Sequence, residues 1–349
     1  LGFVDITNVR CVERAELELH PEQNLIWGGN GSGKTSLLEA IYLVGRGRSF
    51  RTRNTERVIR RGAERLVVFG RTVEPEGTVG LQAERGNPTI GKVGGAAVSS
   101  LAELSQVLPV QVIDPSIHKL VEEGAPRRRR WMDWAVFHVE QGFVENWTRY
   151  QRALQQRNAA LRRAPAQAAA WDPELVRVGE ALAESRRRSL ERLSPYWEET
   201  VQALVGRAVT LSYSQGWNRE RPLADALHDS LARDLAQGVT HFGPHRADVH
   251  LRIDGTPARE IASRGQQKMI AVSMILAQLR MLRETFATSP TLLIDDPAAE
   301  LDDAHLSVFI DQVRRLSCQL VLTSLGPDPG IFRAPERRFH VEQGWVSPL

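Results

Sequence analysis

A glycine-rich loop near the start of the chain constrains the fold more than any other feature. It reads Gly28-Gly29-Asn30-Gly31-Ser32-Gly33-Lys34-Thr35 and satisfies the pattern G-x-x-x-x-G-K-[ST]. The loop follows an apolar run at residues 25–27 and precedes a helical pattern of apolar residues at 37–44. Together with later apolar strands that alternate with helices, this order predicts an α/β fold around a buried parallel sheet.

The residue types of this loop suit the phosphates of a nucleotide. Glycines let backbone N–H groups curl around phosphate oxygens, and the N-terminus of the next helix adds positive potential. Lys34 is expected to reach the β- and γ-phosphates and to serve catalysis, and the Thr35 hydroxyl to bind Mg²⁺. A merely structural glycine turn is the alternative. We predict that ATP and Mg²⁺ bind here, through Gly28, Gly29, Asn30, Gly31, Ser32, Gly33, Lys34, Thr35 and Ser36.

A second apolar strand, at residues 291–294, ends in two adjacent acids, Asp295 and Asp296. A phosphate-binding loop needs a further acid to complete the magnesium shell, and Asp295 is in the right place for it. Asp296 would then orient or deprotonate the attacking water. A solvated pair of strand-end acids is the alternative, but adjacent carboxylates repel one another unless a cation lies between them, which favours the metal site.

A long helical pattern from about residue 265 to 287 is preceded by Ser263-Arg264-Gly265-Gln266-Gln267. Ser263 is well placed to cap this helix. Taken alone, the segment is equally well explained as an ordinary N-cap, which contributes about 1 kcal/mol.

The rest of the chain divides into a strand-rich part and a helical insertion. Residues 126–206 have a helical pattern with one break at 164–173, which predicts two helices in a short antiparallel hairpin and no long coiled coil. Asp254-Gly255 predicts a tight hairpin turn after a strand at 249–253. We expect an ATP-binding α/β lobe I from residues 1–120 and 240–349, and a helical lobe II from residues 121–239.

Composition excludes several classes of protein. With 349 residues, 42% hydrophobic and 25% charged, the chain suits one large or two smaller globular domains and not a disordered or collagen-like protein. Cys11 and Cys318 lack the spacing of metal ligands, and structural roles are favoured over a metal site for His241, His245 and His250. No apolar run approaches the roughly 18 residues of a membrane span. We therefore expect a cytoplasmic protein.

Basic charge is concentrated between residues 46 and 65. This segment has eight arginines and two glutamates, a net charge of +6, whereas the whole chain has +3. Such a segment is expected in a protein that binds phosphate backbones, with a solvated arginine-rich face as the alternative. A second run of arginines, at residues 127–130, lies at a predicted helix start, where the helix dipole disfavours positive charge. Either DNA or nearby acidic residues could compensate for this unfavourable interaction. The candidate DNA contacts are Arg46, Arg48, Arg51, Arg53 and Arg57.

Six segments occur in the order found in the RecF family of bacterial recombination mediators. They are the glycine-rich loop and residues 45–52 (GRGRSFRT), 128–134 (RRRWMDW), 243–248 (GPHRAD), 263–268 (SRGQQK) and 295–302 (DDPAAELD). The resemblance covers residues 5–345 and is much more specific than the loop alone. It implies a two-lobed ABC-type ATPase head, similar to the heads of SMC proteins but without their long coiled-coil arm.

The resemblance also implies what such a head does. It implies ATP-driven dimerisation on gapped DNA and at junctions of double- and single-stranded DNA, and cooperation with RecR and RecO in loading RecA. The implied partners are thus DNA, including single-stranded DNA, a second copy of the chain, RecR and RecO. No membrane partner is implied, and the protein is expected to be associated with the nucleoid. The implied signature segment, which contacts the γ-phosphate of a nucleotide held by the second copy, is Ser263, Arg264, Gly265 and Gln266.

Three positions depart from the usual patterns. Asp296 stands where most ABC ATPases have glutamate, which is one methylene longer, so we expect a weak, DNA-stimulated ATPase that works as a switch. Ser324 replaces the usual switch histidine, which puts a γ-phosphate sensor there in doubt. Asn8-Val9-Arg10 replaces the family's usual Asn-Phe-Arg, which leaves a nucleotide role for Arg10 open.

Two other functions carry some of the same motifs. The ATPase subunit of a membrane transporter also has the loop, the signature and the acid strand. The helical hairpin, the basic segment and the missing switch histidine count against it. A small-molecule kinase or another monomeric P-loop enzyme would have no use for a signature helix.

Overall fold

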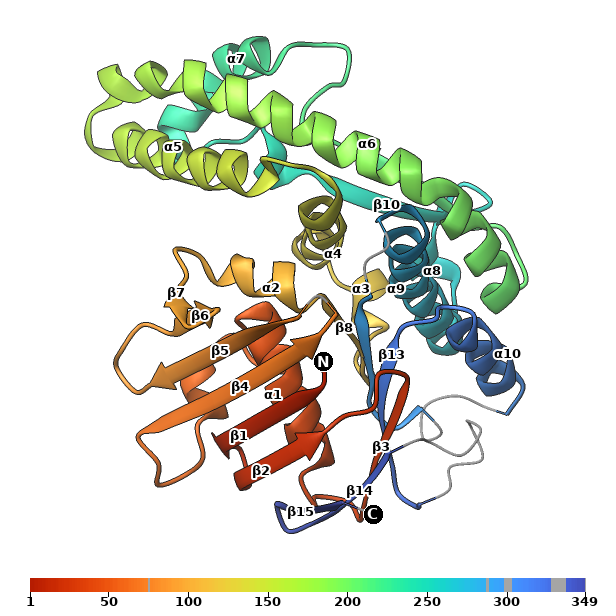
Figure 1. Ribbon diagram of the computed structural model, residues 1–349. Helices are drawn as coiled ribbons and strands as arrows, with labels where there is room; N and C mark the ends of the chain where they lie inside the picture. Colours follow the sequence, from red (N-terminus) through yellow and green to blue (C-terminus); the bar gives the residue numbers. More distant parts are fainter. Residues whose placement is uncertain (75, 287–288, 298–302, 328–336, 349) are drawn as a thin grey trace. The chain divides into compact units, whose positions relative to one another are not determined.

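The chain folds into two compact units. The computed structural model describes residues 1–74, 76–286, 289–297, 303–327 and 337–348 (Figure 1). The first unit comprises Leu1–Ile117 and Leu282–Leu349, and the second comprises His118–Met281. The second unit is thus an insertion into the first.

A six-stranded sheet forms the centre of the first unit, in the order β15-β14-β3-β13-β12-β8. Strands β14, β3, β13, β12 and β8 are parallel, and β15 pairs with β14 in the antiparallel sense. The inner strands are buried on both faces, as continuous apolar runs predict. The strands are β3 (Gln23–Trp27), β8 (Val110–Ile113), β12 (Thr291–Ile294), β13 (Gln319–Ser324), β14 (Arg337–Glu342) and β15 (Trp345–Pro348).

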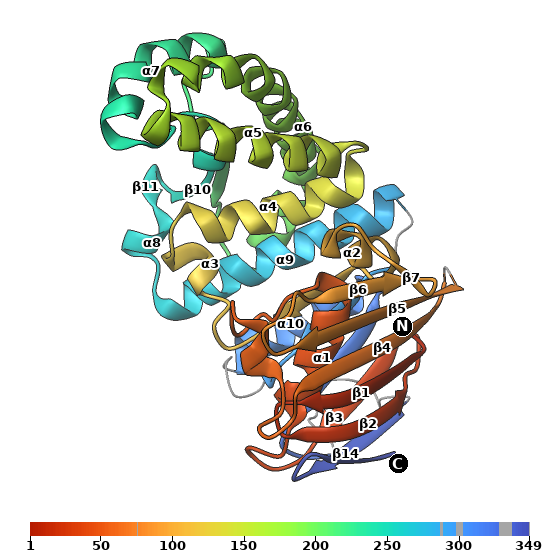
Figure 2. The same ribbon diagram turned by 90° about the vertical axis from the view of Figure 1, so that its left-hand side faces the viewer.

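A second, antiparallel sheet of the same unit has the order β2-β1-β4-β5-β6-β7. Helix α1 (Lys34–Arg46) packs against this sheet, and Figure 2 shows it behind strands β4 and β1. Leu37, Leu38 and Ile41 of α1 are fully buried in the resulting core. The strands are β1 (Phe3–Val9), β2 (Val12–Glu18), β4 (Arg65–Val73), β5 (Glu76–Glu84), β6 (Ile90–Val93) and β7 (Ala96–Ala97).

Short helical elements complete the first unit. They connect the sheets or follow strand β12 along the chain. Their bounds are η1 (Thr55–Val58), η2 (Leu101–Glu103), α2 (Leu104–Val107) and α10 (Asp303–Arg314).

Helices dominate the second unit (Figure 1). Helices α5 and α6 pack against each other and are joined by η3 (Pro165–Trp171), which confirms the predicted hairpin and its break. Helix α9 (Arg264–Phe286) agrees with the predicted long helix and crosses the boundary of the units. The other helices are α3 (Lys119–Glu122), α4 (Ala125–Val139), α5 (Phe143–Arg163), α6 (Asp172–Val205), α7 (Leu223–Gln237), η4 (Pro244–Arg246) and α8 (Ala258–Ile261).

A small antiparallel sheet of the second unit has the order β11-β10-β9, with β9 (Thr210–Ser214), β10 (Asp248–Ile253) and β11 (Thr256–Pro257). Strands β10 and β11 are joined by the predicted turn Asp254-Gly255. Both turn residues have positive φ, 48° and 80°, as a tight hairpin requires.

The second unit extends further along the chain than the expected lobe II, which ended at residue 239. Residues 240–281, expected in lobe I, belong to the second unit because they pair with its earlier segments. Strand β10 pairs with β9, and the indole Nε1 of Trp131 donates to the Met274 carbonyl at 3.1 Å. These pairings join residues far apart in the sequence, and periodicity alone does not reveal them.

The basic run at the start of α4 binds acids and carbonyls of its own unit. Arg128 makes two hydrogen bonds of 2.8 Å to the Asp248 carboxylate. Arg127 pairs with Glu123 at 2.8 Å, and Arg129 donates to the backbone of the same β10 region. Neighbouring acids therefore offset the unfavourable interaction between these arginines and the positive end of the helix dipole.

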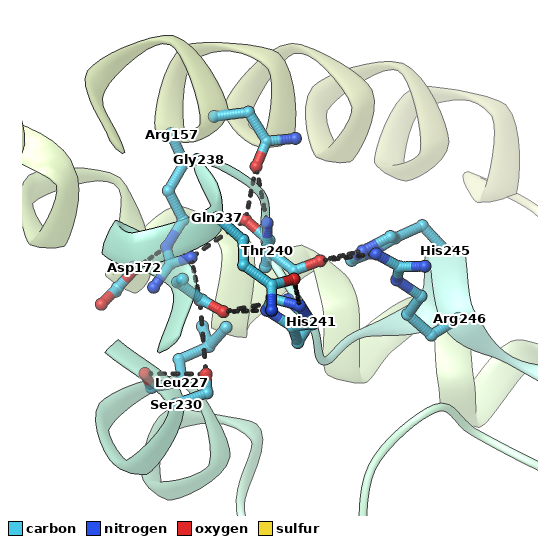
Figure 3. Close-up of polar contacts among 12 residues, drawn as sticks. Arg157, Asp172, Leu227, Ser230, Gln237, Gly238, Thr240, His241, His245 and Arg246 are labelled. Carbon is cyan, nitrogen blue, oxygen red and sulfur yellow. Dashed lines mark hydrogen bonds and ion pairs between the residues drawn. The ribbon is translucent and has the colours of Figure 1, made fainter. Parts of the chain in front are cut away.

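A buried ion-pair network ties together three helices of the second unit (Figure 3). The fully buried Arg157 of α5 donates from Nε to Asp172 at the start of α6 and from Nη1 to Asp234 of α7, both at 2.6 Å. Nη1 also donates to the Thr240 hydroxyl at 2.9 Å. Asp234 is itself fully buried and also contacts Nδ1 of His241 at 2.7 Å.

A second polar contact lies next to this network. Nδ1 of His245 lies 2.6 Å from the Tyr150 hydroxyl, and its Nε2 lies 3.0 Å from the Thr240 carbonyl. Burial lowers the pKa of His245 to about 4, so the imidazole is neutral at neutral pH. His241 and His245 thus have structural contacts, in line with the roles favoured above.

No helix in the described part of the chain is long and apolar enough to cross a membrane.

We predict that Arg157→Met lowers the free energy of unfolding by about 3–5 kcal/mol, because it leaves a buried Asp234 carboxylate without its guanidinium. Urea denaturation followed by circular dichroism would measure the change. The matched control is Arg152→Met on the exposed face of the same helix, which should change the stability by less than about 0.5 kcal/mol. Equal losses in the two variants would contradict a stabilising role of the network.

Candidate nucleotide-binding site

The glycine-rich loop connects strand β3 to helix α1, as predicted. Gly33, the N-cap of α1, has φ 119°, which only glycine adopts without strain. Gly28 is required for close packing, because a Cβ there would lie 2.2 Å from the Val341 carbonyl oxygen. The loop therefore has the backbone shape of a phosphate-binding loop.

The N-terminus of α1 is prepared for an anion. No side chain caps it, and its first turn has no acidic residue. The Ser32 hydroxyl is buried and has no hydrogen-bond partner among the described residues. Unsatisfied donors at a helix N-terminus stabilise negative charge. These residues therefore fit the phosphates of a nucleotide.

Lys34 lies folded into the loop. Its Nζ donates to the carbonyl oxygens of Gly28 and Gly29 at 2.7 and 2.8 Å, and the residue is only 8% exposed. Burial lowers the pKa of Lys34, and the nearby carboxylates of Asp296 and Asp295 oppose this effect. The ammonium group is thus held within the loop and close to the acid strand.

The acid strand meets the loop at the carboxyl edge of the parallel sheet. The Thr35 hydroxyl lies 3.0 Å from both carboxylate oxygens of Asp295. A hydroxyl and a carboxylate are the oxygen donors that Mg²⁺ prefers. The structure therefore brings together the two residues predicted as metal ligands, and their donor set fits that ion.

Thr323 organises both acids. Its buried hydroxyl donates to Asp295 Oδ1 and accepts from the Asp296 backbone N–H, each at 2.9 Å. Asp296 has φ 46°, an unusual conformation for a residue with a side chain. Such local strain is concentrated at functional sites.

Several contacts of the loop come from distant segments that the sequence analysis did not predict to touch it. The turn between β14 and β15 covers it, because the Gly344 N–H donates to the Ser32 carbonyl at 2.8 Å. The Ser324 carbonyl accepts from the Gly28 N–H at 3.3 Å. Cys11, in the turn after β1, packs against Gly33. A Cβ added to Gly33 would lie 3.2 Å from the Cys11 sulfur.

Asp114 is another acid at this edge that sequence reasoning missed. It follows β8, the neighbour of β12, and accepts from the Ser116 N–H at 3.0 Å. The signal was available, since an apolar strand followed by an acid is the same pattern that revealed Asp295.

Arg10 binds a buried carboxylate of helix α1. Its Nε and Nη2 donate to both oxygens of Glu39, at 2.8 and 2.9 Å, and Glu39 is fully buried. The Ser49 hydroxyl donates to the same carboxylate, and Arg51 lies 3.6 Å from it. Arg10 and Arg51 thus hold the helix that follows the phosphate-binding loop.

The implied signature segment lies in the second unit, at the start of α9. Ser263 and Gln266 form a reciprocal cap: the Gln266 N–H donates to the Ser263 hydroxyl at 3.3 Å, and the Ser263 N–H donates to Gln266 Oε1 at 3.0 Å. Ser263, Arg264 and Gly265 are exposed. Ser263 therefore caps the helix, as predicted, and the segment remains accessible.

The candidate DNA contacts differ in exposure. Arg48, Arg51, Arg53 and Arg57 are exposed on the first unit. Arg46 is half-buried, with its guanidinium 5.7 Å from the centre of the Tyr42 ring, and burial lowers its pKa to about 10. Arg46 is thus partly engaged with the fold. Residues 298–302, the end of the matched acid segment, lie outside the described residues.

The chain matches the protein family described as "RecF/RecN/SMC N terminal domain" over residues 1–330. It is 39% identical to the DNA replication and repair protein RecF of Pseudomonas paraeruginosa (strain DSM 24068 / PA7), over 99% of this chain and 97% of that protein. It is 38% identical to the protein of that name from Stutzerimonas stutzeri (strain A1501), over 100% and 97% of the two chains.

Two solved structures extend the comparison to the fold. One is described as the recombination mediator protein RecF with ATP in the RecFOR pathway; it has a TM-score of 0.90 and 25% identity, and the match covers 100% of this chain and 97% of that one. The other, the Smc head domain with a coiled coil and joint from Pyrococcus yayanosii, has a TM-score of 0.60 and 12% identity, with 100% and 96% covered. The second likeness concerns the fold alone. The chain therefore belongs to the RecF family and has the fold of an ABC-type P-loop ATPase head with an inserted α-helical subdomain.

Proposed function

We propose that this protein is an ATP-dependent DNA-binding protein of recombinational repair and replication restart. The observation that carries the proposal is the Thr35 hydroxyl 3.0 Å from the Asp295 carboxylate, beside an uncapped helix N-terminus. The names of the similar proteins, a DNA replication and repair protein and an ATP-bound recombination mediator, support the same function.

In this proposal the loop residues Gly28 to Ser36 bind ATP, and Thr35 with Asp295 holds Mg²⁺. When bound, the metal neutralises charge on the β- and γ-phosphates. Lys34 exchanges its two loop carbonyls for phosphate oxygens, which keeps its ammonium group hydrogen-bonded in a partly desolvated place. The buried Ser32 hydroxyl and the first N–H groups of α1 supply further donors.

Asp296 is proposed to orient or deprotonate the attacking water. Its backbone is fixed by the bond to Thr323, so its short side chain has little freedom to approach that water. This restricted approach supports slow hydrolysis that resets a switch, and stimulation of that hydrolysis by DNA is part of the same proposal.

The signature segment is proposed to act on a second copy of the chain. Ser263, Arg264, Gly265 and Gln266 stand at the N-terminus of the 23-residue helix α9, and the first three are exposed. A helix N-terminus with a serine hydroxyl suits the γ-phosphate of an ATP held by the partner copy. ATP binding thereby drives homodimerisation.

DNA is the proposed macromolecular ligand, in the form of gapped duplex, junctions or single strands. The exposed arginines 48, 51, 53 and 57 support this, because a net charge of +6 between residues 46 and 65 attracts phosphates. Cooperation with RecR and RecO, promotion of RecA loading and a cytoplasmic, nucleoid-associated location complete the proposal. The family match argues against the transporter subunit and the monomeric P-loop enzyme.

We predict that Ser263→Arg abolishes ATP-dependent dimerisation and leaves ATP binding by the monomer intact. The long cation would obstruct the approach of a second copy, whereas the phosphate-binding loop belongs to the other unit. Sedimentation velocity with and without ATP measures the first property, and fluorescent-nucleotide titration the second. Lys34→Met should instead weaken ATP binding itself.

Two controls make this test specific. Ser263→Ala removes the cap, at about 1 kcal/mol, without adding bulk, and Thr148→Arg adds the same cation to an exposed position of α5. A dimer that persists in Ser263→Arg would overturn the role in trans, as would an equal loss of ATP binding.

Asp296→Asn should reduce the ATP turnover rate by about 10²–10⁴-fold, because the amide cannot accept the proton of water. ATP affinity should stay unchanged. A coupled phosphate-release assay measures turnover, and Asp311→Asn on the exposed side of α10 is the control. Unchanged turnover in Asp296→Asn would remove this residue from the mechanism.

Replacing Arg48, Arg53 and Arg57 with alanine should flatten the salt dependence of DNA affinity. The slope of log K against log salt falls by about 0.9 for each phosphate that the protein no longer neutralises. Fluorescence anisotropy of a labelled gapped duplex at several salt concentrations measures it. The triple variant Arg152→Ala, Arg163→Ala and Arg233→Ala, also exposed, should keep the slope. Equal slopes in both triple variants would assign the basic segment another role.

A further inference from the structure

A pocket of about 580 Å³ lies in the second unit, and none of its lining residues belongs to the nucleotide site. It is formed by one stretch of helix α6, strand β9 and the loop that follows. Part of its lining, called the floor here, consists of apolar and aromatic side chains that are almost fully buried. The floor residues are Leu190, Leu193, Trp197 and Trp217.

Strand β9 lines this pocket along most of its length and is an edge strand. Among the residues that the structure describes, it pairs only with β10, in the order β11-β10-β9. The opposite edge, β11, is two residues long and contains Pro257, which protects it from pairing. Strand β9 has five residues, Thr-Leu-Ser-Tyr-Ser, without a proline or a charge. Its edge is therefore unprotected.

The pairing register shows which backbone groups face the free edge. The two-residue turn Asp254-Gly255 closes on the hydrogen-bonded pair Ile253 and Thr256, so the next residue, Arg252, directs its N–H and C=O toward β9. In β9 the partner of Arg252 is Thr210. The alternating residues Leu211 and Tyr213 thus point their backbone groups outward. Among the described residues, no segment accepts from or donates to these groups.

The charged side chains of the pocket differ in their pairing. Arg187 is engaged by Glu184 and Glu191, at 2.5 and 2.6 Å. Arg219 is exposed and makes no ion pair with any described residue. One uncompensated positive charge therefore lies beside the apolar floor.

We propose that the free edge of β9 binds an extended segment of a partner protein, which adds a strand to the sheet. The backbone of the segment pairs with Leu211 and Tyr213, one apolar side chain enters the pocket, and a carboxylate pairs with Arg219. A row of backbone donors and acceptors suits a peptide. It does not suit single-stranded DNA, which requires a groove of several cations. The proposal is independent of the proposed function.

A panel of fluorescein-labelled heptapeptides tests the proposal on the full-length protein. Each peptide alternates threonine with other residues, carries leucine, phenylalanine or tryptophan at its centre, and has an aspartate two residues before or after it. We expect at least one of them to bind in fluorescence anisotropy. Arg219→Glu should weaken that binding by about tenfold or more and strengthen binding of the matching lysine peptide. ATP binding by this variant should be unchanged, which shows that it is folded.

Backbone methylation distinguishes strand addition from simple apolar binding. Methyl groups on one alternating set of peptide nitrogens should abolish binding, whereas methyl groups on the other set should leave it, because only one set faces β9. The proposal is overturned if no peptide binds at about 1 mM or if both methylated forms bind equally. It is also overturned if oligodeoxythymidylate displaces the peptide and its own binding is weakened by Arg219→Glu to the same extent.

Discussion

The contact between the Thr35 hydroxyl and the Asp295 carboxylate organises the first unit. The two residues are 260 positions apart. Thr35 lies in the first turn of α1, which the loop connects to β3, and Asp295 directly follows β12; β3 and β12 are separated in the sheet only by β13. Thr323, at the end of that intervening strand, bonds to both acids. Helix α1 and the ends of strands β12 and β13 thus bring two hydroxyls and one carboxylate into contact. Crevices at the carboxyl ends of parallel strands commonly bind ligands, and this contact lies at such an edge, which supports the proposed nucleotide site.

The second unit depends on a different kind of interaction. Its helices are joined by charges that lie inside it: Arg157 binds Asp172 and Asp234 where α5, α6 and α7 meet. A buried ion pair gives a helix packing a defined geometry, because removal of one partner leaves an uncompensated charge. The small sheet of β9, β10 and β11 then connects residues 210–214 with residues 248–257. Together with the bond from the Trp131 indole to the Met274 carbonyl, this pairing ties the segment after residue 240 to the second unit.

Local patterns were sufficient to predict the main helices and strands, and they singled out Thr35 and Asp295, which the structure brings into contact. Three patterns each predict the structure of their own segment. They are the glycine pattern, the apolar strand before two acids and the serine at the start of a long helix. The parallel sheet and the helical hairpin also follow from periodicity. Contacts between distant segments do not: nothing local in Gly344, Thr323 or Cys11 indicates that they surround the loop. The same reason applies to the arginines: Arg10 and Arg51 contact Glu39, but nothing in the local sequence distinguishes Arg51 from the other exposed arginines of its segment.

The Gly344 N–H that donates to the Ser32 carbonyl has a mechanical consequence. A Cβ on Gly344 would lie 2.4 Å from the Cys11 carbonyl oxygen, so the β14–β15 turn is wedged against both the β1–β2 turn and the loop. The tips of the two turns and the loop are therefore packed closely against one another. The β14–β15 hairpin is thus coupled by a direct backbone hydrogen bond to the loop that precedes α1, so a displacement of this hairpin must either break that bond or shift the loop.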